Sequence, residues 1–293
     1  MRAPLSRQRV PSARQPRRRR IPVALTIAGS DSGGGAGVQA DLKTFAAFNV
    51  HGVCALTCVT AQNPGRVLRI QPCAPRLVRE QIEAVLDELP PAAAKTGMLC
   101  NEGIIRELIR LFRDRARMPL VVDPVMISTS GTRLLRASAV KLLVNGLFPL
   151  AAMVTPNLRE AEVITGRVLR SPEDLRWAAR QIHRRCGCAV LLKGGHLRGR
   201  EAADIFFDGR TELLLTAPFV KGVRTHGTGC TLSAAVTALL ASGHALPDAV
   251  CQAKSYVAGA IAAARCAASH PVLNHFFQFP SLLTTASYRA TRP

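Results

Sequence analysis

The chain alternates between short apolar runs and longer segments in which apolar residues recur every three or four positions. Short runs of this kind are typical of buried β-strands, and the periodic segments are typical of amphipathic helices. Strands are therefore predicted over 22–28, 52–60, 93–98, 120–123, 151–155 and 189–193, with a hairpin formed by 203–207 and 212–216. Helices are predicted from Val38 onward and over 76–89, 102–115, 138–147, 172–185, 229–241 and 247–264.

Strands that alternate with helices indicate βαβ units and a mostly parallel sheet covered by helices on both faces. The predicted strands are nearly continuous in apolar residues, as expected for strands that are buried on both faces. The sequence shows no internal repeat and no interdomain linker, so we expect one α/β domain over residues 21–280. Ligands of such sheets bind beyond the carboxyl ends of the strands.

Composition and charge narrow the class of protein. Of the 293 residues, 48% are hydrophobic, which excludes global disorder. The net charge is +20, and eight Arg with no acid stand in residues 1–20, which we interpret as a disordered arm. This arm could be a solvated extension, a tether to nucleic acid or an anionic surface, or an organelle transit peptide. Residues 281–293 are interpreted as a tail.

Membrane insertion and secretion find no support in the sequence. No apolar run reaches the roughly 18–20 residues that a membrane helix needs, and no signal-peptide pattern opens the chain. The nine Cys are an odd number scattered through apolar segments, which favours a reduced, cytoplasmic compartment.

The segment from His226 to Thr231 reads His-Gly-Thr-Gly-Cys-Thr and stands just before an Ala-rich predicted helix. Glycines at a helix N-terminus let backbone N–H groups approach a phosphate, and the helix dipole favours its charge. Cys230 would lie in the first turn, where we expect its pKa to fall from about 8.5 toward neutrality. The alternative is an ordinary turn capped by Thr228, with Cys230 buried.

A second Gly-rich segment, 29–37, satisfies neither the dinucleotide pattern GxGxxG nor the Walker pattern. It is expected to be irregular, and either lines a binding surface through its backbone or is a flexible solvent loop. Asp31 and Asp41 flank it and could contact a polar ligand.

Acidic residues follow two predicted strands. Asp123 ends one strand, and Glu160 follows another, after Thr155 and Asn157. Mg²⁺ prefers oxygen ligands and is often held by one or two carboxylates together with substrate phosphates. The alternative is that Asn157 or Thr155 caps a helix, with Glu160 as its capping-box partner or as a solvated acid. Lys193, at another strand end, could reach a phosphate as a point charge.

Taken in order, these segments resemble the hydroxymethylpyrimidine/phosphomethylpyrimidine kinases, the thiamin-pathway branch of the ribokinase-like superfamily. The resembling segments cover most of residues 23–277: Leu25–Gly37, Gln39–Phe45, Thr60–Asn63, Lys95–Leu99, Asp123–Met126, Thr155–Leu158 with Glu160, Leu192–His196 and His226–Ala235. One segment departs from the pattern. Where the family has Gly-His-Gly-Pro-x-Asn-His, residues 269–275 read Ser-His-Pro-Val-Leu-Asn-His, which puts a contact between the tail and the active site in doubt.

The resemblance implies a three-layer α/β/α fold with a central, mostly parallel sheet, ATP and Mg²⁺ as cofactors, and a homodimer. Because no apolar run is long enough to span a membrane, no membrane partner is expected, and a nucleic-acid partner is not expected either. It implies that Gln62 contacts the pyrimidine and that Cys230 replaces the Asp base of related sugar kinases. The remaining implied site residues are, for the substrate, Gly29, Asp41, Val59, Met98 and Val125; for the anion hole, Gly227, Thr228 and Gly229; for the nucleotide, Asn157, Lys193, Thr225 and Lys254; for the metal, Asp123 and Glu160.

The implied activity is transfer of the γ-phosphoryl group of ATP to 4-amino-5-hydroxymethyl-2-methylpyrimidine and then to its monophosphate. Cys230 would either accept the hydroxyl proton or orient the hydroxyl. The alternative enzyme is a pyridoxal kinase of the same superfamily, because both substrates are flat heteroaromatic rings with a hydroxymethyl arm. A regulatory or nucleic-acid-binding protein that kept the fold and lost activity is the alternative from another class.

Overall fold

The computed structural model describes residues 20–115, 117–126, 134–195, 201–220 and 226–279. The predicted arm up to residue 19, the predicted tail 281–293 and the predicted nucleotide contact Thr225 lie outside these ranges.

The described residues form a nine-stranded sheet in the order β3-β2-β1-β4-β5-β6-β7-β8-β9. Its strands are β1 Val23–Asp31, β2 His51–Asn63, β3 Arg66–Pro72, β4 Ala93–Thr96, β5 Leu120–Val122, β6 Met153–Val154, β7 Ala189–Lys193, β8 Glu201–Phe207 and β9 Glu212–Pro218. The strands from β2 to β7 in this order are parallel, while β3 pairs antiparallel with β2, and β8 and β9 continue the sheet antiparallel after β7. The predicted mostly parallel sheet and the predicted hairpin are confirmed.

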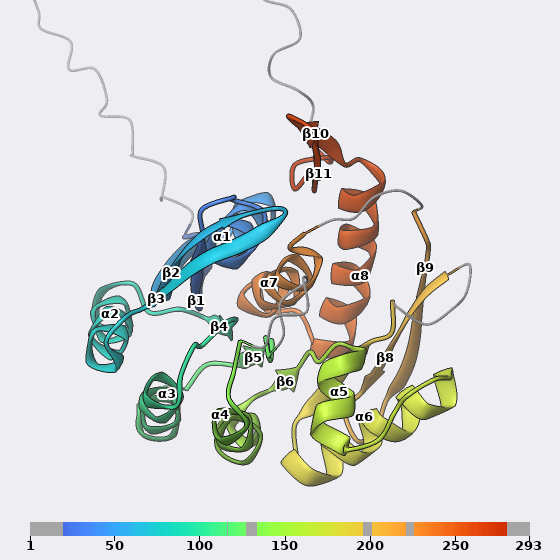
Figure 1. Cartoon of the computed structure of the whole chain (residues 1–293), viewed down its shortest axis with the longest axis horizontal. Helices are drawn as coiled ribbons and strands as arrows, with labels where there is room; N and C mark the ends of the chain where they lie inside the picture. The colour runs from blue at the N-terminus through green and yellow to red at the C-terminus, as the bar shows by residue number, and fades with distance from the viewer. Residues whose placement is uncertain (1–19, 116, 127–133, 196–200, 221–225, 280–293) are drawn as a thin grey trace, which may run out of the picture.

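Helices cover both faces of the sheet, which gives the predicted three layers (Figure 1). One layer contains α1 Gly37–Ala47, α7 Thr228–Ala241 and α8 Leu246–Ala262, and the other contains α2 Pro75–Glu88, α3 Glu102–Asp114, α4 Ala137–Leu142, α5 Leu158–Thr165 and α6 Pro172–Cys186. Successive strand residues point to opposite faces of the sheet. Val121 packs with α7 and α8, whereas its neighbours Leu120 and Val122 belong to the core on the other face. None of the helices within the described ranges is long and apolar enough to cross a membrane.

Several predicted boundaries are wrong. The segment 29–37 is not irregular throughout, because β1 continues to Asp31 and α1 begins at Gly37. The register of β1 against β2 shifts between Ala28 and Ser30, so a β-bulge carries the strand past the glycine. β2 is not fully buried: Val59 is 50% exposed near the end that pairs with β3, a strand that the sequence analysis missed.

Other elements were also missed or simplified. The predicted helix 138–147 is α4 followed by one π-helical turn over 143–147 and a 3₁₀ turn over 148–150. α5 was not predicted as a helix, and a small two-stranded sheet of β10 Arg265–Ala267 and β11 His270–Val272 follows α8. These short elements bury too few residues to leave a periodic signal in the sequence.

A charged residue lies inside the core. Lys95, in β4, is 0% exposed, and its ammonium donates to Asp41 Oδ1 at 2.8 Å. Asp41, at the first turns of α1, also accepts from Thr26 Oγ1 at 2.6 Å. Burial opposes the charge on Lys95, but Asp41 outweighs it and raises the pKa of the ammonium. The ion pair therefore ties α1 to the middle of the sheet.

Replacing Lys95 with Met should leave the Asp41 carboxylate buried without its counter-ion. We expect the free energy of unfolding to fall by about 3–5 kcal/mol, measured by urea denaturation followed by circular dichroism. The double variant Lys95→Met/Asp41→Leu should recover much of the loss.

The control for this prediction is Arg76→Ala, which breaks an exposed pair with Glu80 within α2. It should cost less than about 0.5 kcal/mol. A Lys95→Met protein as stable as this control would contradict the structural importance of the buried pair.

Candidate active site

The first turn of α7 stands at the carboxyl edge of the sheet. Gly227 is its N-cap, with φ of 89°, so the backbone is in the left-handed region. A Cβ at this position would collide with the carbonyl oxygen of Gly35 in the loop that follows β1. Glycine is therefore required where the two Gly-rich segments meet. Thr228 is the first helical residue rather than the cap, so the alternative of a Thr228-capped turn is wrong.

The helix start is built to attract an anion. The N-cap has no side chain to bond the amides of the first turn. The amides together with the helix dipole favour negative charge at this end. A Cβ at Gly229 would lie 3.2 Å from Lys193 Nζ and 3.8 Å from Asp123 Oδ2, which places both charged groups directly against this turn. The structure thus brings together the predicted anion hole, the predicted phosphate-binding lysine and one predicted metal ligand.

Asp123 is the centre of a buried polar cluster. Its Oδ1 accepts from Lys193 Nζ at 2.9 Å and from Thr155 Oγ1 at 3.0 Å. Burial opposes ionisation, but Lys193 and then Lys95 outweigh it and lower the pKa of Asp123. Ser233, one turn into α7, approaches Oδ2 at 3.4 Å. The carboxylate is therefore charged and fixed beside the helix start.

Glu160 is buried at the start of α5 and forms a capping box with Asn157: Asn157 N–H donates to Glu160 Oε2 at 2.9 Å, and Glu160 N–H donates to Asn157 Oδ1 at 3.0 Å. The capping alternative is thus confirmed. Glu160 Oε1 also accepts from the N–H of Met126 at 3.2 Å. Burial raises the pKa of Glu160 to about 7, with Lys193 lowering it and Asp123 raising it. Because a carboxylate has more lone pairs than these contacts use, a metal role stays a prediction.

The pKa of the Cys230 thiol differs from the prediction. Burial raises its pKa to about 11, although Lys95 and the backbone N–H of Gly37 act to lower it. The predicted fall toward neutrality is wrong because the thiol is surrounded largely by protein, although the residue as a whole is half-buried. Loss of hydration therefore outweighs the stabilising charges. The thiol is neutral at physiological pH.

The predicted substrate residues lie on neighbouring strand ends. Gly29 is in β1, where a Cβ would lie 2.6 Å from Cys58 Sγ. Met98 follows β4, and its carbonyl accepts from Thr57 Oγ1 at 2.6 Å. Val125 follows β5, with its N–H donating to the Asp123 carbonyl at 2.9 Å. Val59 is in β2. Asp41 is fully buried with both oxygens bonded, so its assignment to the substrate stays a prediction.

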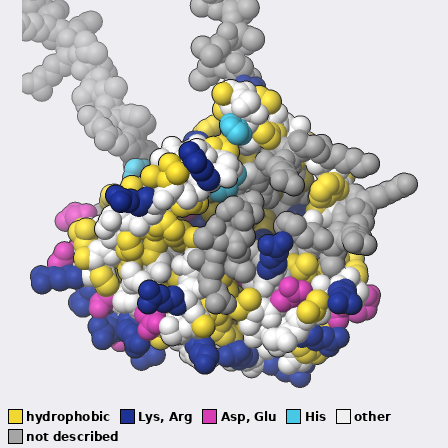
Figure 2. All heavy atoms as spheres, in the orientation of Figure 1, with side chains coloured by type: hydrophobic (Ala, Val, Ile, Leu, Met, Phe, Trp, Pro, Cys, Tyr) yellow, Lys and Arg dark blue, Asp and Glu magenta, His cyan; other side chains and the backbone are white. Residues whose placement is uncertain are grey.

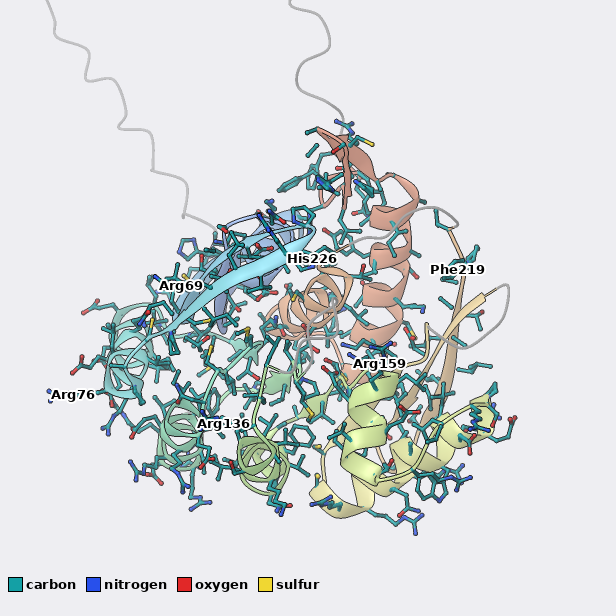
Figure 3. The ribbon with its side chains drawn as sticks, viewed as in Figure 1. Arg69, Arg76, Arg136, Arg159, Phe219 and His226 are labelled. Atoms are coloured by element: carbon teal, nitrogen blue, oxygen red, sulfur yellow. The ribbon has the colours of Figure 1, made fainter. Side chains whose placement is uncertain are left out.

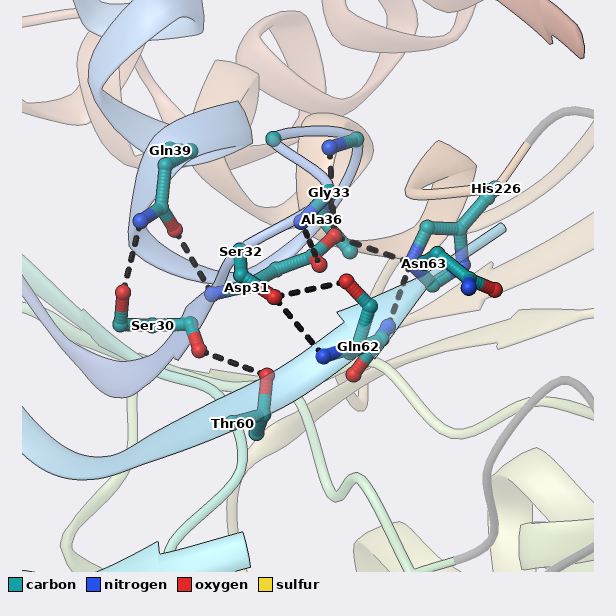
Figure 4. A network of polar contacts seen from close by, with 12 residues as sticks. Ser30, Asp31, Ser32, Gly33, Ala36, Gln39, Thr60, Gln62, Asn63 and His226 are labelled. Atoms are coloured by element: carbon teal, nitrogen blue, oxygen red, sulfur yellow. Dashed lines mark hydrogen bonds and ion pairs between the residues drawn. The ribbon is translucent and has the colours of Figure 1, made fainter. Parts of the chain in front are cut away.

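The loop after β1 is held in place by several bonds (Figure 4). Asp31 accepts from the N–H groups of Gly33 at 2.8 Å, Gly35 at 3.2 Å and Ala36 at 2.9 Å. Ser32 Oγ donates to the carbonyl of Gln62 at 2.6 Å and accepts from its N–H at 2.7 Å. The structure therefore favours the loop as part of the binding surface, since its residues are bonded to β2.

Lys254 does not join this cluster. Its ammonium donates to Asp204 Oδ2 at 2.7 Å and to the Ala202 carbonyl at 3.0 Å, and Asp204 in turn accepts from the N–H of Gly194. A nucleotide contact by Lys254 stays a prediction, and its role in this structure is to fix Asp204, which holds the residue after Lys193.

The altered segment 269–275 does reach α7. His275 Nε2 lies 3.1 Å from Thr231 Oγ1, and the His275 carbonyl accepts from Tyr256 OH at 2.7 Å. The sequence analysis missed this contact, along with Lys95, Ser233 and a role for His226. Asn274 and His275 match the Asn-His that ends the family segment, and this match was the only feature of the sequence that could have predicted the contact.

Comparison with known proteins agrees with this geometry. The family model for phosphomethylpyrimidine kinase matches residues 31–272. The hydroxymethylpyrimidine/phosphomethylpyrimidine kinase of Rhizobium meliloti is 48% identical over 246 residues, which are 83% of this chain and 91% of that protein. The crystal structure of phosphomethylpyrimidine kinase from Clostridium difficile is 41% identical, with a TM-score of 0.72, and the match covers 80% of this chain and 97% of that one. An ADP complex of Bacillus subtilis pyridoxal kinase is 36% identical, with a TM-score of 0.83, and covers 88% and 99%.

The raised pKa of Cys230 predicts how its alkylation depends on pH. Iodoacetamide reacts with the thiolate, so the labelling rate of Cys230 should rise about tenfold per pH unit between pH 7 and 9.5, with no plateau. Mass spectrometry of the peptide that contains Cys230 gives the rate. The exposed Cys251 serves as an internal reference for reagent activity. A plateau of the Cys230 rate below pH 8 would show that the thiol has a low pKa after all.

Proposed function

This chain belongs to the phosphomethylpyrimidine kinase family, and on that basis we propose that it transfers the γ-phosphoryl group of ATP to 4-amino-5-hydroxymethyl-2-methylpyrimidine. A second transfer, to the monophosphate, would give the diphosphate used in thiamin biosynthesis. The observation that carries the proposal is the start of α7, where the first helical turn meets Lys193, Asp123 and Cys230.

Transfer of a phosphoryl group needs positioning and charge stabilisation more than covalent chemistry. The amides of Gly227 to Cys230 and the ammonium of Lys193 would stabilise the charge that spreads over the transferred group. Nucleotide-bound structures of related pyridoxal kinases, one with ADP, support ATP as the donor.

Cys230 would act as a neutral thiol. With its pKa raised to about 11, the thiolate needed for a general base is scarce at physiological pH. A loose transition state requires little proton removal before the phosphoryl group moves. We therefore favour orientation of the substrate hydroxyl by the Cys230 sulfur over proton abstraction.

The residues present fit a divalent cation held partly by phosphates and water. Asp123 and Glu160 both lie near Lys193, and Lys95 is paired with Asp41, so these two lysines leave one negative charge uncompensated when all three carboxyls are ionised. No group of three or more His, Cys, Asp or Glu in the described ranges could hold a metal by itself. Mg²⁺ suits such a site because it keeps waters and binds through few carboxylates. It would supply charge neutralisation at the phosphates.

Surface charge supports small-molecule rather than nucleic-acid partners. Basic side chains on the face shown in Figure 2 are interspersed with acidic ones. Several arginines form ion pairs with them, as Arg79 does with Glu83 and Arg110 does with Glu107. A homodimer is also proposed, because β3 is an edge strand and because Leu68 in β3 and Val59 in β2 are exposed apolar side chains. The cytoplasmic location stays a prediction.

The second candidate is phosphorylation of pyridoxal or pyridoxine, which the higher TM-score of the Bacillus subtilis pyridoxal kinase favours. Purified protein with radiolabelled ATP and Mg²⁺ should convert the hydroxymethylpyrimidine to its monophosphate and then to its diphosphate. We expect a diphosphate from the hydroxymethylpyrimidine and no more than a monophosphate from pyridoxal or pyridoxine, with the products resolved by ion-exchange chromatography.

Cys230→Ala is the control for this assay and should lose most of the turnover at every pH. Full turnover by this variant would remove both roles considered for Cys230. Products from pyridoxine alone would replace the proposed function with the second candidate.

The metal assignment predicts a shift in Mg²⁺ dependence. Glu160→Gln should raise the Mg²⁺ concentration for half-maximal turnover about tenfold or more, because one anionic ligand or water acceptor is lost. The matched control is Glu162→Gln in the same helix, whose carboxylate instead accepts from the N–H of Leu169. Equal Mg²⁺ dependence in the two variants would exclude Glu160 from the metal site.

A further inference from the structure

His226 connects three segments that are far apart in the sequence. It lies between the end of β2 and the start of α7 (Figure 3). Its Nε2 is 2.9 Å from the side-chain amide nitrogen of Gln62 and 3.1 Å from Oδ2 of Asp31 (Figure 4). The ring is packed closely, since a Cβ at Gly35 would lie 3.1 Å from His226 Cδ2. This nitrogen therefore has two polar neighbours and little freedom to turn away from either.

A single imidazole nitrogen cannot form hydrogen bonds with both an amide NH₂ group, which is a donor, and a carboxylate, which is an acceptor. In the ring plane it has either one proton or one lone pair. With a lone pair it accepts from the Gln62 NH₂ group but faces the Asp31 carboxylate without a proton. With a proton it donates to Asp31, and the part of the Gln62 amide in contact with it must then be an acceptor.

The surroundings of Asp31 decide between these states. Its Oδ2 already accepts from the N–H groups of Gly35 and Ala36, so it is held as an acceptor. Gly33 also donates to the other oxygen of this carboxylate, and hydrogen bonds from three backbone N–H groups stabilise its ionised form whatever the state of His226. An ionised carboxylate repels a lone pair, so the proton belongs on His226 Nε2.

The two ends of the Gln62 amide are nearly equal in shape, and a half-turn exchanges oxygen and nitrogen without moving other atoms. We propose that Asp31, acting through His226, holds the Gln62 amide with its oxygen toward His226 and its NH₂ group toward the substrate. Asp31 and His226 are then positioning residues. They make Gln62 a hydrogen-bond donor and select a heteroaromatic ring with an acceptor nitrogen at that place.

The claim that Gln62 contacts the substrate ring rests on the proposed function, but the claim that His226 Nε2 carries a proton does not. Long-range ¹H–¹⁵N correlation spectra of the ligand-free, ¹⁵N-histidine-labelled protein report which ring nitrogen bears hydrogen. The signals of His226 are identified by their loss in His226→Gln. We expect a protonated Nε2. A neutral ring with its proton on Nδ1 alone would overturn the proposal, whatever the enzyme phosphorylates.

Kinetics test the consequence for selectivity. His226→Leu should lower kcat/KM for the aminopyrimidine about tenfold or more, mainly through KM, because Gln62 is free to present either end. With the hydroxymethyl arms superposed, pyridoxine has a hydroxyl-bearing carbon where the aminopyrimidine has its second ring nitrogen, and a hydroxyl can pair with either end of the Gln62 amide. The loss of kcat/KM for pyridoxine should therefore be smaller, and the preference for the aminopyrimidine should narrow. His226→Gln keeps an N–H donor near the same position and should restore most of the preference.

The matched control is Gln39→Leu, which loosens the same loop from its other side. Gln39 Oε1 accepts from the N–H of Asp31 at 2.9 Å, and its Nε2 donates to Ser30 Oγ at 2.7 Å, but it contacts neither His226 nor Gln62. The ratio of kcat/KM for the aminopyrimidine to that for pyridoxine should be the same in Gln39→Leu as in the unmodified protein. Equal losses for both rings in His226→Leu, without rescue in His226→Gln, would reduce His226 to a structural role. A protein that phosphorylates neither ring would refute the proposed function, while the spectra still decide the state of His226.

Discussion

Two buried ion pairs hold the helix start on which the site depends. Lys95 pairs with Asp41 from α1, and Lys193 pairs with Asp123 after β5. Removing ions from water costs several kcal/mol each unless they are paired and bonded. The pairs therefore fix α1 and the strand ends against α7 in one arrangement, and both lysines add positive charge beneath its first turn.

The same burial that makes these pairs strong changes the chemistry of their neighbours. It leaves Asp123 ionised because two lysines face it, but it raises the pKa of Glu160 to about 7 and that of Cys230 to about 11, because too little positive charge reaches these two groups. A site with one fixed carboxylate, one titratable carboxyl and a neutral thiol suits a reaction driven by charge stabilisation rather than by a strong base.

The Gly-rich loop after β1 is the second structural element on which the site depends. Beyond the bulge between Ala28 and Ser30, Asp31 accepts hydrogen bonds from three backbone N–H groups of this loop and contacts His226. Gly227 and Gly35 meet without side chains between them, so the loop and the anion-binding turn form one surface. The groups expected to touch the ring and those expected to touch phosphate are thereby linked through His226.

The sequence by itself determined the layered α/β fold, the order of its main elements and the turn at 227–230, because apolar periodicity and glycine placement are local signals. It also predicted that Lys193, Asp123 and the start of α7 would meet, since the ends of parallel strands share one edge. It left open whether Asn157 and Glu160 form a capping box, and it did not reveal β3 or the raised pKa of Cys230. Only the tertiary structure decided these, because hydration, charge pairing and the partner of a buried group such as Lys95 depend on residues brought together from distant parts of the chain.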